Sequence, residues 1–463
     1  MSPTLSILIT TSLYLFHLAR AGPYAGSTVS VLIPFTEAGS MTTPFSSRYH
    51  IPIQLSTGPP GTTINTHHVY NPFVDTGSTG LLLPATDIPG FTVPTGPGAE
   101  RGWQYLTSSK TLYGGWWIEK DVFFNANNDM PIVKSTVKIL AVTERTKECS
   151  DLQIHGDLYT CPESPSSDLR DFHGILGIGF GRRGPDQPQA FPDRNPALKA
   201  STIGGRAATW PTFHRGYQID QRGITIGLTD ENMVPFTIGR QPYAQLENPS
   251  PGGSVSSLPD WKGLRSCVSV DSSPCVPMRV LLDTGVTESY LHMPYSFYMD
   301  GSTRVDWDFN RRIHKTPIAT GSTTYTLDAT SRVRINFWPL PPVGHKNEDF
   351  SVGDAATIAS GVTPSLVYFW VNNDANRFRV NTGMHVYRKY KVAFDSLWGW
   401  FWLAAAADCP RSGCPRCIPV HSCLQSRLCT DETPDDDPPC CHAAEENAEC
   451  ERQREECRWA GCY

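Results

Sequence analysis

Residues 73–81 read FVDTGSTGL, and residues 281–289 read LLDTGVTES. Each stretch places two apolar residues directly before Asp-Thr-Gly, and the two aspartates, Asp75 and Asp283, lie 208 residues apart. An apolar pair before the aspartate predicts the end of a buried strand, and the glycine permits a sharp turn that backbone amides can approach. A repeat over this distance predicts two similar lobes that each contribute one carboxylate.

The chemistry that such a pair offers is general acid–base hydrolysis. Carboxylates that meet face to face, about 3 Å apart, cannot both ionise cheaply and therefore share one proton. The ionised partner takes a proton from a trapped water, while the protonated partner donates to the carbonyl oxygen of an amide, so no covalent intermediate is needed. The alternative is that the two triplets are unrelated turns, and their common apolar prefix argues against it.

The composition excludes several classes of protein. The chain has 463 residues, of which 38 are Gly, 39 are Pro and 18% are charged, so a coiled coil is excluded. Its 11% aromatic content argues against extensive disorder. The length predicts about two or three domains. The formal charge of −6 gives no basic excess for phosphates, so no nucleic-acid partner is expected.

Hydrophobic periodicity favours short strands. Residues 49–55, 137–140 and 333–338 alternate apolar and polar side chains, and Pro/Gly-rich turn clusters separate such runs. This pattern predicts an all-β protein. Residues 248–259 form either a linker or a long surface loop. The apolar residues 397–407 are too few to span a bilayer and predict a buried strand, so no membrane partner is expected.

Further stretches follow the paired motifs in an order that resembles the pepsin-like family of aspartic endopeptidases. Residues 112–115, LYGG, resemble the flap, a hairpin that closes over substrate with a tyrosine at its tip. Residues 172–179, FHGILGIG, resemble the apolar segment behind the first aspartate, and residues 383–395 resemble its C-terminal counterpart. The resemblance covers residues 45–404 and implies a bilobal acid-protease fold.

The resemblance also implies roles for single residues. Asp75 and Asp283 would form the catalytic dyad, Thr76 and Thr284 would cross-link the two turns, and Ser78 would hydrogen-bond the outer side of Asp75. The remaining active-site support would come from Gly77 and Gly285. The substrate would be covered by Tyr113, with Gly114 and Gly115 giving the hairpin its mobility.

Two residues depart from the family pattern. Val286 stands where the family has a second Ser or Thr, and a hydrogen bond to a charged group is typically worth about 1.5–3 kcal/mol. We therefore expect a raised pKa of Asp283 or an asymmetric dyad. Leu82 replaces a tryptophan that supports the flap tyrosine, a loss for which Trp116 or Trp117 would compensate. Residues 381–384 are also more polar than their usual counterpart.

The cysteines fall into two groups. Cys149 and Cys161 enclose a polar loop and predict a disulfide, with two free thiols as the alternative, and the resemblance implies a second disulfide between Cys267 and Cys275. The other ten of the 14 cysteines lie in residues 409–462. Some of these have zinc-ligand spacing, but disulfides are favoured over a metal in a secreted chain. The tail is a small binding module, a disulfide-stapled appendage or a poorly ordered extension.

These features divide the chain into five parts. Residues 1–21 read as a cleaved signal peptide because an apolar run precedes Ala-Arg-Ala, with a frayed N-terminal strand as the alternative. An N-terminal segment, residues 22–44, leads into an N-terminal lobe of residues 45–247 and a C-terminal lobe of residues 248–404. Residues 405–463 form a cysteine-rich acidic tail, in which residues 408–463 carry 12 acidic and 6 basic residues.

The sequence thus predicts a secreted, monomeric aspartic endopeptidase that acts on extended peptides at acidic pH, with no cofactor and no metal. A pepsin-fold peptide-binding or proteinase-inhibitor-like protein, whose cleft no longer turns over, is the first alternative. An interaction protein that acts through its cysteine-rich tail is the second.

Overall fold

A computed structural model gives the arrangement of most of the chain outside its two ends. It describes residues 23–36, 48–124, 132–149, 152–155, 158–182, 187–236, 242–247, 257–271, 273–293, 296–299, 303–306, 313–317, 323–338, 346–359, 361–371 and 379–406. The predicted signal peptide, residues 248–256 and all but the first two residues of the tail lie outside these ranges.

The prediction of an all-β protein is confirmed, because strands dominate the described residues. Within these ranges, the helices are two short α-helices, α2 (Ala355–Ala359) and α3 (Val386–Lys389), and three 3₁₀ turns, η1 (Ala85–Asp87), η3 (Pro192–Arg194) and η4 (Val234–Phe236). In the described part of the chain, no helix has the length and apolar character needed to cross a bilayer.

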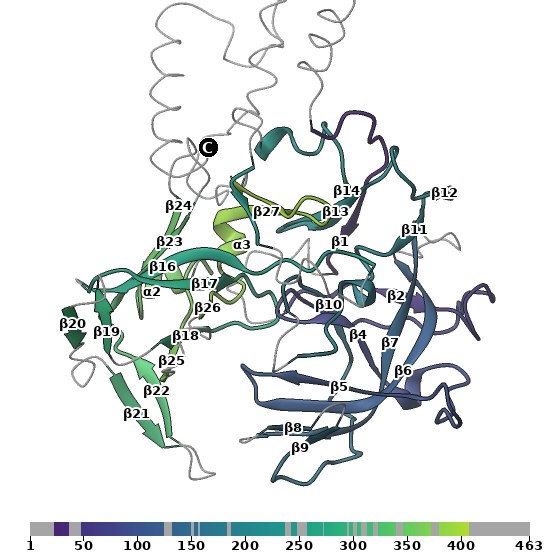
Figure 1. The fold of residues 1–463 in the computed structure, drawn as a ribbon, viewed down its shortest axis with the longest axis horizontal. Coiled ribbons are helices and arrows are strands. Elements are labelled where there is room, and N and C mark those ends of the chain that lie inside the picture. The colour runs from purple at the N-terminus through teal and green to yellow at the C-terminus, as the bar shows by residue number, and fades with distance from the viewer. Residues whose placement is uncertain are drawn as a thin grey trace, which may run out of the picture.

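The N-terminal lobe is a curled nine-stranded sheet, seen at the lower right of Figure 1. Its long central strands alternate buried and more exposed side chains over part of their length, as one-sided packing requires. The strands are β2 (Ile53–Leu55), β3 (Phe73–Asp75), β4 (Thr79–Pro84), β5 (Glu100–Leu106), β6 (Thr111–Phe124), β7 (Val133–Thr146), β10 (Ile175–Ile178), β11 (Ala200–Ile203) and β12 (Arg206–Ala207).

The C-terminal lobe is a second curled nine-stranded sheet, on the left of Figure 1. Its strands are β16 (Leu264–Val270), β17 (Val276–Leu281), β18 (Ser289–Met293), β21 (Ile313–Pro317), β22 (Thr323–Leu327), β23 (Arg332–Phe337), β24 (Lys346–Ser351), β25 (Val367–Val371) and β26 (Arg379–Asn381). Two small hairpins flank the lobes, β8 (Gln153–His155) with β9 (Leu158–Thr160) and β19 (Ser296–Met299) with β20 (Thr303–Asp306).

The two lobes repeat one local arrangement around the Asp-Thr-Gly turns. In the N-terminal lobe, β10 lies parallel to β3 and antiparallel to β4. In the C-terminal lobe, β26 lies parallel to β17 and antiparallel to β18 in the same way. The internal sequence repeat therefore corresponds to a repeat in structure, and the fold is bilobal.

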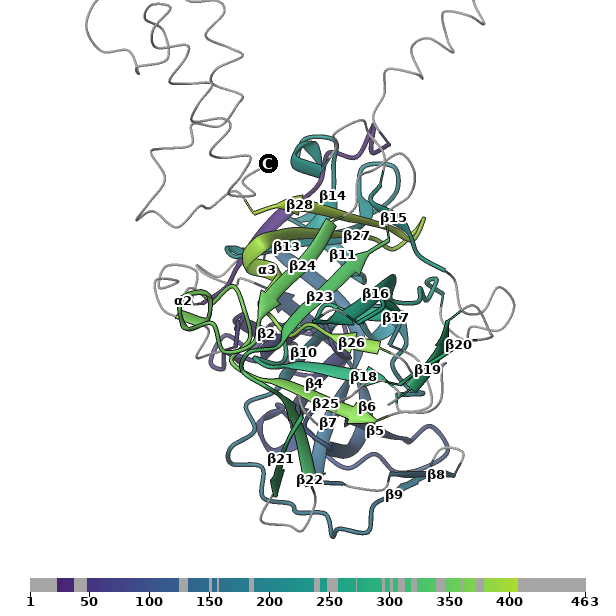
Figure 2. The same ribbon diagram turned by 90° about the vertical axis from the view of Figure 1, so that its left-hand side faces the viewer.

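A six-stranded sheet joins the lobes and lies across one end of both (Figures 1 and 2). It is ordered β1 (Val31–Pro34), β14 (Gly223–Leu228), β13 (His214–Asp220), β27 (Tyr390–Asp395), β28 (Trp400–Ala405) and β15 (Ala244–Gln245). β28 is the strand expected within residues 397–407. Since β1 comes from the N-terminal segment, this segment is partly built into the folded body.

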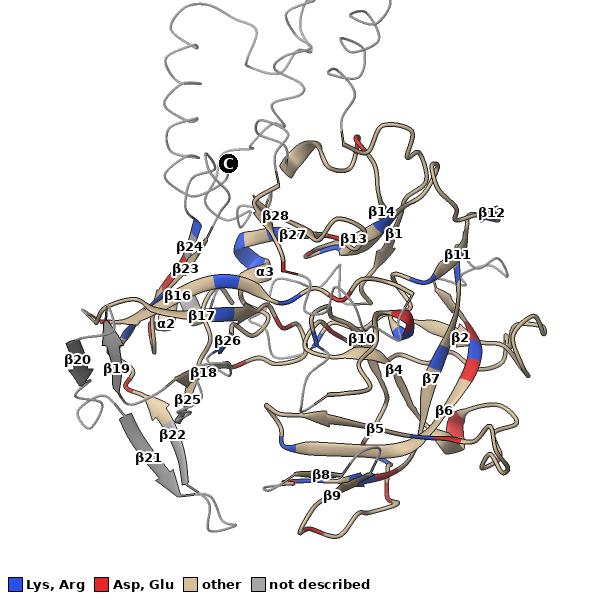
Figure 3. Ribbon diagram, in the orientation of Figure 1, with Lys and Arg blue, Asp and Glu red and all other residues tan. Residues whose placement is uncertain are grey.

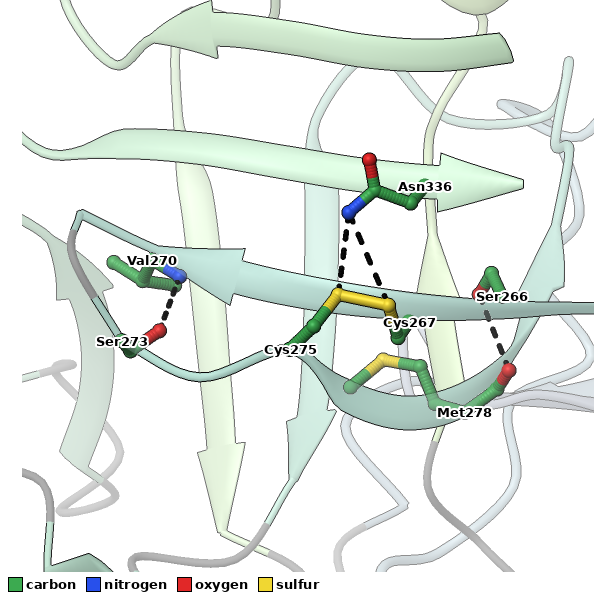
Figure 4. Close-up of a disulfide and its surroundings, with 7 residues drawn as sticks. All are labelled: Ser266, Cys267, Val270, Ser273, Cys275, Met278 and Asn336. Atoms are coloured by element: carbon green, nitrogen blue, oxygen red, sulfur yellow. Dashed lines mark hydrogen bonds between the residues drawn. A yellow bond between two sulfur atoms is a disulfide. The ribbon is translucent and has the colours of Figure 1, made fainter. Parts of the chain in front are cut away.

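The two predicted disulfides are present in the folded body. Cys149 and Cys161 are therefore not free thiols, which was the alternative for this pair. Cys149 bonds to Cys161, and Cys267 on β16 bonds to Cys275 just before β17. Figure 4 shows the second bond closing the β16–β17 hairpin, where the Asn336 amide of β23 donates to Cys275 Sγ at 3.2 Å. This disulfide lies in the hairpin whose second strand, β17, leads to Asp283.

Candidate active site

The two aspartates lie at the ends of buried strands in equivalent turns. β3 ends at Asp75, and β17 ends two residues before Asp283. Both side chains are buried, since Asp75 is 4% and Asp283 is 3% exposed. The Gly77 N–H donates to Asp75 Oδ1 at 2.6 Å, and the Gly285 N–H donates to Asp283 Oδ1 at 2.8 Å. Each turn thus folds back on its own carboxylate.

The structure brings the two turns together in one cleft. A methyl group built on Gly77 would lie 2.6 Å from Cγ of Asp283, and one built on Gly285 would lie 2.7 Å from Cγ of Asp75. Both distances are shorter than any real carbon contact, so each turn glycine packs directly against the carboxylate of the opposite lobe. The close approach of the lobes is what requires glycine at these two positions.

The electrostatic surroundings favour a shared proton. Burial and the neighbouring Asp283 carboxylate raise the pKa of Asp75, while hydrogen bonds from Ser78 and Gly77 oppose the rise. The Ser78 hydroxyl donates to Asp75 Oδ2 at 2.6 Å. Because two adjacent buried carboxylates cannot both ionise cheaply, the pair retains one proton at acidic pH.

The two threonines cross-link the lobes symmetrically. The Thr76 hydroxyl donates to Leu282 O at 2.6 Å and accepts from the Thr284 N–H at 2.9 Å. The Thr284 hydroxyl donates to Val74 O at 2.8 Å and accepts from the Thr76 N–H at 3.1 Å. Both side chains are buried, so these four bonds fix the relative position of the two turns.

The outer side of Asp283 has a donor that the sequence prediction missed. Val286 cannot donate, as expected, but the Asn381 amide at the end of β26 donates to Asp283 Oδ2 at 2.5 Å. The hydroxyl that Val286 lacks is therefore replaced by an amide from another strand, so the two aspartates have different donors. The unusual polarity of residues 381–384 was the only signal in the sequence, and it did not say which carboxylate the amide would reach.

The predicted hairpin exists, but its tip is elsewhere. β5 and β6 turn through residues 107–110, and Tyr113 is a paired residue of β6, opposite Gln104 on β5 and Arg145 on β7. The Tyr113 ring packs 4.6 Å from that of Phe172. The prediction that Tyr113 lies at the hairpin tip is thus wrong. Tyr113 does line the cleft that holds both aspartates. Its role in substrate binding remains a prediction.

The same correction applies to the two glycines. Gly114 and Gly115 lie inside β6, at a bulge in its pairing with β7. A methyl group on Gly115 would lie 2.8 Å from the carbonyl carbon of Ala141, and one on Gly114 would lie 2.8 Å from Glu144 Oε1. Gly115 thus permits close packing against the backbone of β7, and Gly114 leaves room for the side chains of Tyr159 and Glu144. Neither glycine lies at the hairpin tip, where it was expected to provide mobility.

Of the two tryptophans considered as compensation for Leu82, Trp117 is the one that lies beside it. It is buried in one cluster with Leu82 and Tyr113. Its indole N–H donates to Gln189 Oε1 at 2.7 Å, and the Arg194 guanidinium lies over its ring at 3.7 Å. Trp116 is half-buried and takes no part in this cluster; Arg101 lies 5.3 Å from its ring.

The cleft has a volume of about 230 Å³ and is lined by both lobes and by the hairpin tip. Its charged lining, beyond the two aspartates, comprises Arg48, Arg145, Asp171, Arg182 and Arg379. Elsewhere on the described chain, basic and acidic segments are interspersed (Figure 3). A larger hollow of about 830 Å³ lies beside Asp87 and Arg170, but no predicted site residue lines it.

Among the described residues, one cluster of potential metal ligands occurs, formed by Cys149, Cys161 and Glu163. Both sulfurs are in the disulfide, so this cluster is not available to an ion.

No model of a known protein family matches the chain, and no curated protein matches it. A functional proposal therefore depends on the geometry of the site and on the motifs that form it.

Proposed function

We propose that this chain is a secreted, pepsin-like aspartic endopeptidase, which hydrolyses peptide bonds with a water activated between Asp75 and Asp283. The single observation that carries the proposal is the mutual packing of each turn glycine against the opposite buried carboxylate. Two unrelated Asp-Thr-Gly turns have no reason to meet in this symmetric way.

In the proposed reaction, the dyad begins with one proton. The ionised carboxylate takes a proton from the water as its oxygen attacks the peptide carbonyl carbon, and the protonated carboxylate donates its proton to the carbonyl oxygen. The tetrahedral diol then collapses, one hydroxyl returns its proton to the dyad, and the dyad protonates the leaving amine. No bond forms between protein and substrate, and the dyad ends with one proton again.

The hairpin would act as the cover of an extended peptide. Residues Leu106, Thr107, Ser108 and Ser109 line the cleft together with the dyad. Ligand sites of drug-sized molecules typically occupy about 300–1,000 Å³, so a cleft of about 230 Å³ is too small for a peptide of several residues. In this proposal, the hairpin lifts when substrate enters and excludes water when it closes again.

Secretion and a monomeric state belong to the same proposal. Two disulfides in the folded body fit an oxidising compartment, and the N-terminal sequence carries the pattern of a signal peptide.

A pepsin-fold binding protein without turnover is the second candidate, and the departures from the family pattern at Val286 and Leu82 favour it. Ser108 Oγ at the tip lies 3.4 Å from Asn381 Nδ2, and Lys110 Nζ lies 5.6 Å from the Trp370 ring of the C-terminal lobe. These contacts join the tip to the C-terminal lobe, and the entry of any peptide, whether cleaved or only bound, would break them.

A cleavage assay separates the candidates. Purified protein is incubated with denatured globin between pH 3 and pH 6, with and without a statine-type inhibitor, and Asp75→Asn serves as the matched inactive variant. We expect inhibitor-sensitive cleavage by the natural chain only. Inhibitor binding without cleavage would favour the binding protein, and the absence of both would contradict the proposed active site.

A further inference from the structure

We propose that Asn381 is a positioning residue of the dyad, whose side-chain amide holds Asp283 in place of the hydroxyl that Val286 lacks. Its part in hydrolysis rests on the proposed function, whereas the hydrogen bond to Asp283 does not.

The two turns differ at the residue three positions after each aspartate. In the N-terminal lobe this residue is Ser78, whose hydroxyl donates to Asp75 Oδ2 at 2.6 Å. In the C-terminal lobe it is Val286, which has no donor. The Gly285 N–H serves only Oδ1 of Asp283, and a buried carboxylate oxygen without a donor is costly, so the donor to Oδ2 has to come from another position.

The strand register shows where the replacement comes from. Asn381 pairs with Leu281, two residues before Asp283, and with Tyr290, seven residues after it. In the N-terminal lobe, the residue at the same register is Ile175, which pairs with Phe73 and Leu82. Ile175 is apolar and fully buried. The polar residue therefore occupies a different position in each lobe. In the N-terminal lobe the turn position is polar (Ser78) and the strand position is apolar (Ile175). In the C-terminal lobe the turn position is apolar (Val286) and the strand position is polar (Asn381).

The orientation of the Asn381 amide is fixed by its second partner. Asn381 Oδ1 accepts the Gly383 N–H at 2.9 Å, and Nδ2 donates to Asp283 Oδ2 at 2.5 Å. A flipped amide would place its oxygen against the carboxylate and its NH₂ against a backbone N–H, so both contacts would become repulsive. The side chain is only 3% exposed, which leaves little room for another arrangement.

The amide also reaches the cover of the cleft. Nδ2 lies 3.4 Å from Ser108 Oγ at the hairpin tip, in addition to its contact with Asp283. Lifting the hairpin removes the longer contact and leaves the bond to Asp283 intact. Asn381 can thus keep Asp283 oriented while substrate enters.

The test moves the hydrogen-bond donor to Asp283 from position 381 to position 286. Asn381→Leu removes the amide, and the double variant with Val286→Ser restores a hydroxyl at the position equivalent to Ser78. We expect Asn381→Leu to lower kcat by about tenfold with a smaller change in KM, because a lost donor disfavours the ionised carboxylate. For the same reason, the pH at which kcat/KM falls on the acidic side of its pH profile, its acidic limb, is expected to move up by about one unit. The double variant is expected to recover most of both losses.

No charged neighbour of the dyad changes in these variants. The titratable and charged groups that line the cleft around Asp283 are Asp75, Arg48, Arg145, Asp171, Arg182, His292, Arg379 and Tyr113. A shift of the acidic limb in Asn381→Leu, reversed by Val286→Ser, therefore reports the donor and not an altered charge. A purely structural loss would lower the amount of folded enzyme without moving the limb.

A second readout does not require cleavage. The carboxyl titrations are followed by NMR in protein labelled with [4-¹³C]aspartate, and Asp283→Asn identifies the signal of Asp283. An upward shift of that titration in Asn381→Leu supports the inference even if the natural chain cleaves nothing, in which case the proposed function alone fails. An unchanged titration together with an unchanged acidic limb would overturn the inference. If Asn381→Leu does not fold, the smaller Asn381→Ala, with and without Val286→Ser, carries the same expectations.

Discussion

At the scale of single residues, the turn glycines decide whether the two acids can meet. Gly77→Ala and Gly285→Ala each place a methyl group against the opposite carboxylate, and overpacking typically costs about 1–3 kcal/mol. We expect both variants to lower the free energy of unfolding by that amount and to abolish binding of a statine-type inhibitor. Gly98→Ala is the matched control, because no atom lies within 4 Å of the methyl group it adds. Normal inhibitor binding by both turn variants would contradict the close approach of the lobes.

The threonine cross-link makes a second prediction at this scale. Thr76→Val keeps the shape of the side chain but leaves the Thr284 N–H without its acceptor and Leu282 O with only the longer bond from the Tyr387 hydroxyl. Unsatisfied buried polar groups cost about 1–3 kcal/mol, which is the expected fall in the free energy of unfolding measured with urea. Thr284→Val is expected to have a similar effect. Since the two hydroxyls belong to one network, the double variant should lose less than the sum of the single losses. Thr86→Val, at an exposed hydroxyl, is the control.

At the scale of elements, one buried acid on β24, Glu348, pairs with Lys389 at the end of α3. Burial raises the pKa of Glu348 to about 7, although Lys389 lies 3.1 Å away and opposes the rise. A carboxyl group with a raised pKa in the folded state stabilises the fold below its unfolded pKa, and this stability is lost as pH rises through the folded pKa. We therefore expect the free energy of unfolding to fall between about pH 4.5 and pH 7.

The variant Glu348→Gln tests this sign. It cannot ionise, so the fall across that interval should become smaller, and the variant should be more stable than the natural chain at pH 7. Urea unfolding at both pH values measures the difference. A stability curve that is equally steep in Glu348→Gln would assign the pH dependence to other groups, among them Asp75.

Strands occur in all three runs predicted from alternation, residues 49–55, 137–140 and 333–338, whereas the position of the hairpin tip was not predicted. Residues 107–110 contain neither Gly nor Pro, and Lys110 adopts the left-handed conformation, with φ of 50°, without the residue type that usually marks such a turn. The glycines of residues 112–115 were mistaken for the tip because a turn and a close strand crossing both require glycine. The sequence pattern alone does not distinguish these two requirements.

Asn381 was missed for a related reason. The two Asp-Thr-Gly motifs are local, and their chemistry follows from adjacent residues. The donor to Asp283 comes from 98 positions away, through the pairing of β26 with β17. Strand register depends on the packing of the whole lobe, so a single sequence does not reveal which residue will face the carboxylate.

At the scale of the whole molecule, the joining sheet takes strands from both sides of the predicted lobe boundary. β13 and β14 precede the predicted boundary at residue 248, β27 and β28 follow it, and β13 pairs directly with β27. A continuous hydrophobic cluster runs through this sheet and both lobes. The relative position of the two Asp-Thr-Gly turns is thus fixed by a shared core as well as by the threonine network. A site formed by residues of both lobes requires such a fixed arrangement.

The charge of the completed cleft gives a prediction about substrates. Four arginines line it, against Asp171 and a dyad that keeps one negative charge, so the lining has a formal charge of +2 at acidic pH. Asp171 is already paired with Arg145 and Lys147. Burial and the nearby Arg379 lower the pKa of His292 to about 3, so it adds no charge above that pH. Peptides with acidic side chains beside the scissile bond should therefore be cleaved faster than neutral or basic ones.

Peptides that differ only by Glu, Gln or Lys beside the scissile bond measure this preference at about pH 5.5, where a free glutamate is ionised. Because partly exposed ion pairs are worth up to about 1 kcal/mol, we expect kcat/KM to favour Glu over Gln by about three- to fivefold and to disfavour Lys. Arg48→Ala should reduce this ratio, since Arg48 is an exposed part of the lining, and added salt should reduce it further. Arg206→Ala, an exposed arginine on β12 outside the cleft, should leave the ratio unchanged. Equal cleavage of all three peptides would show that the arginines serve the fold and not the choice of substrate.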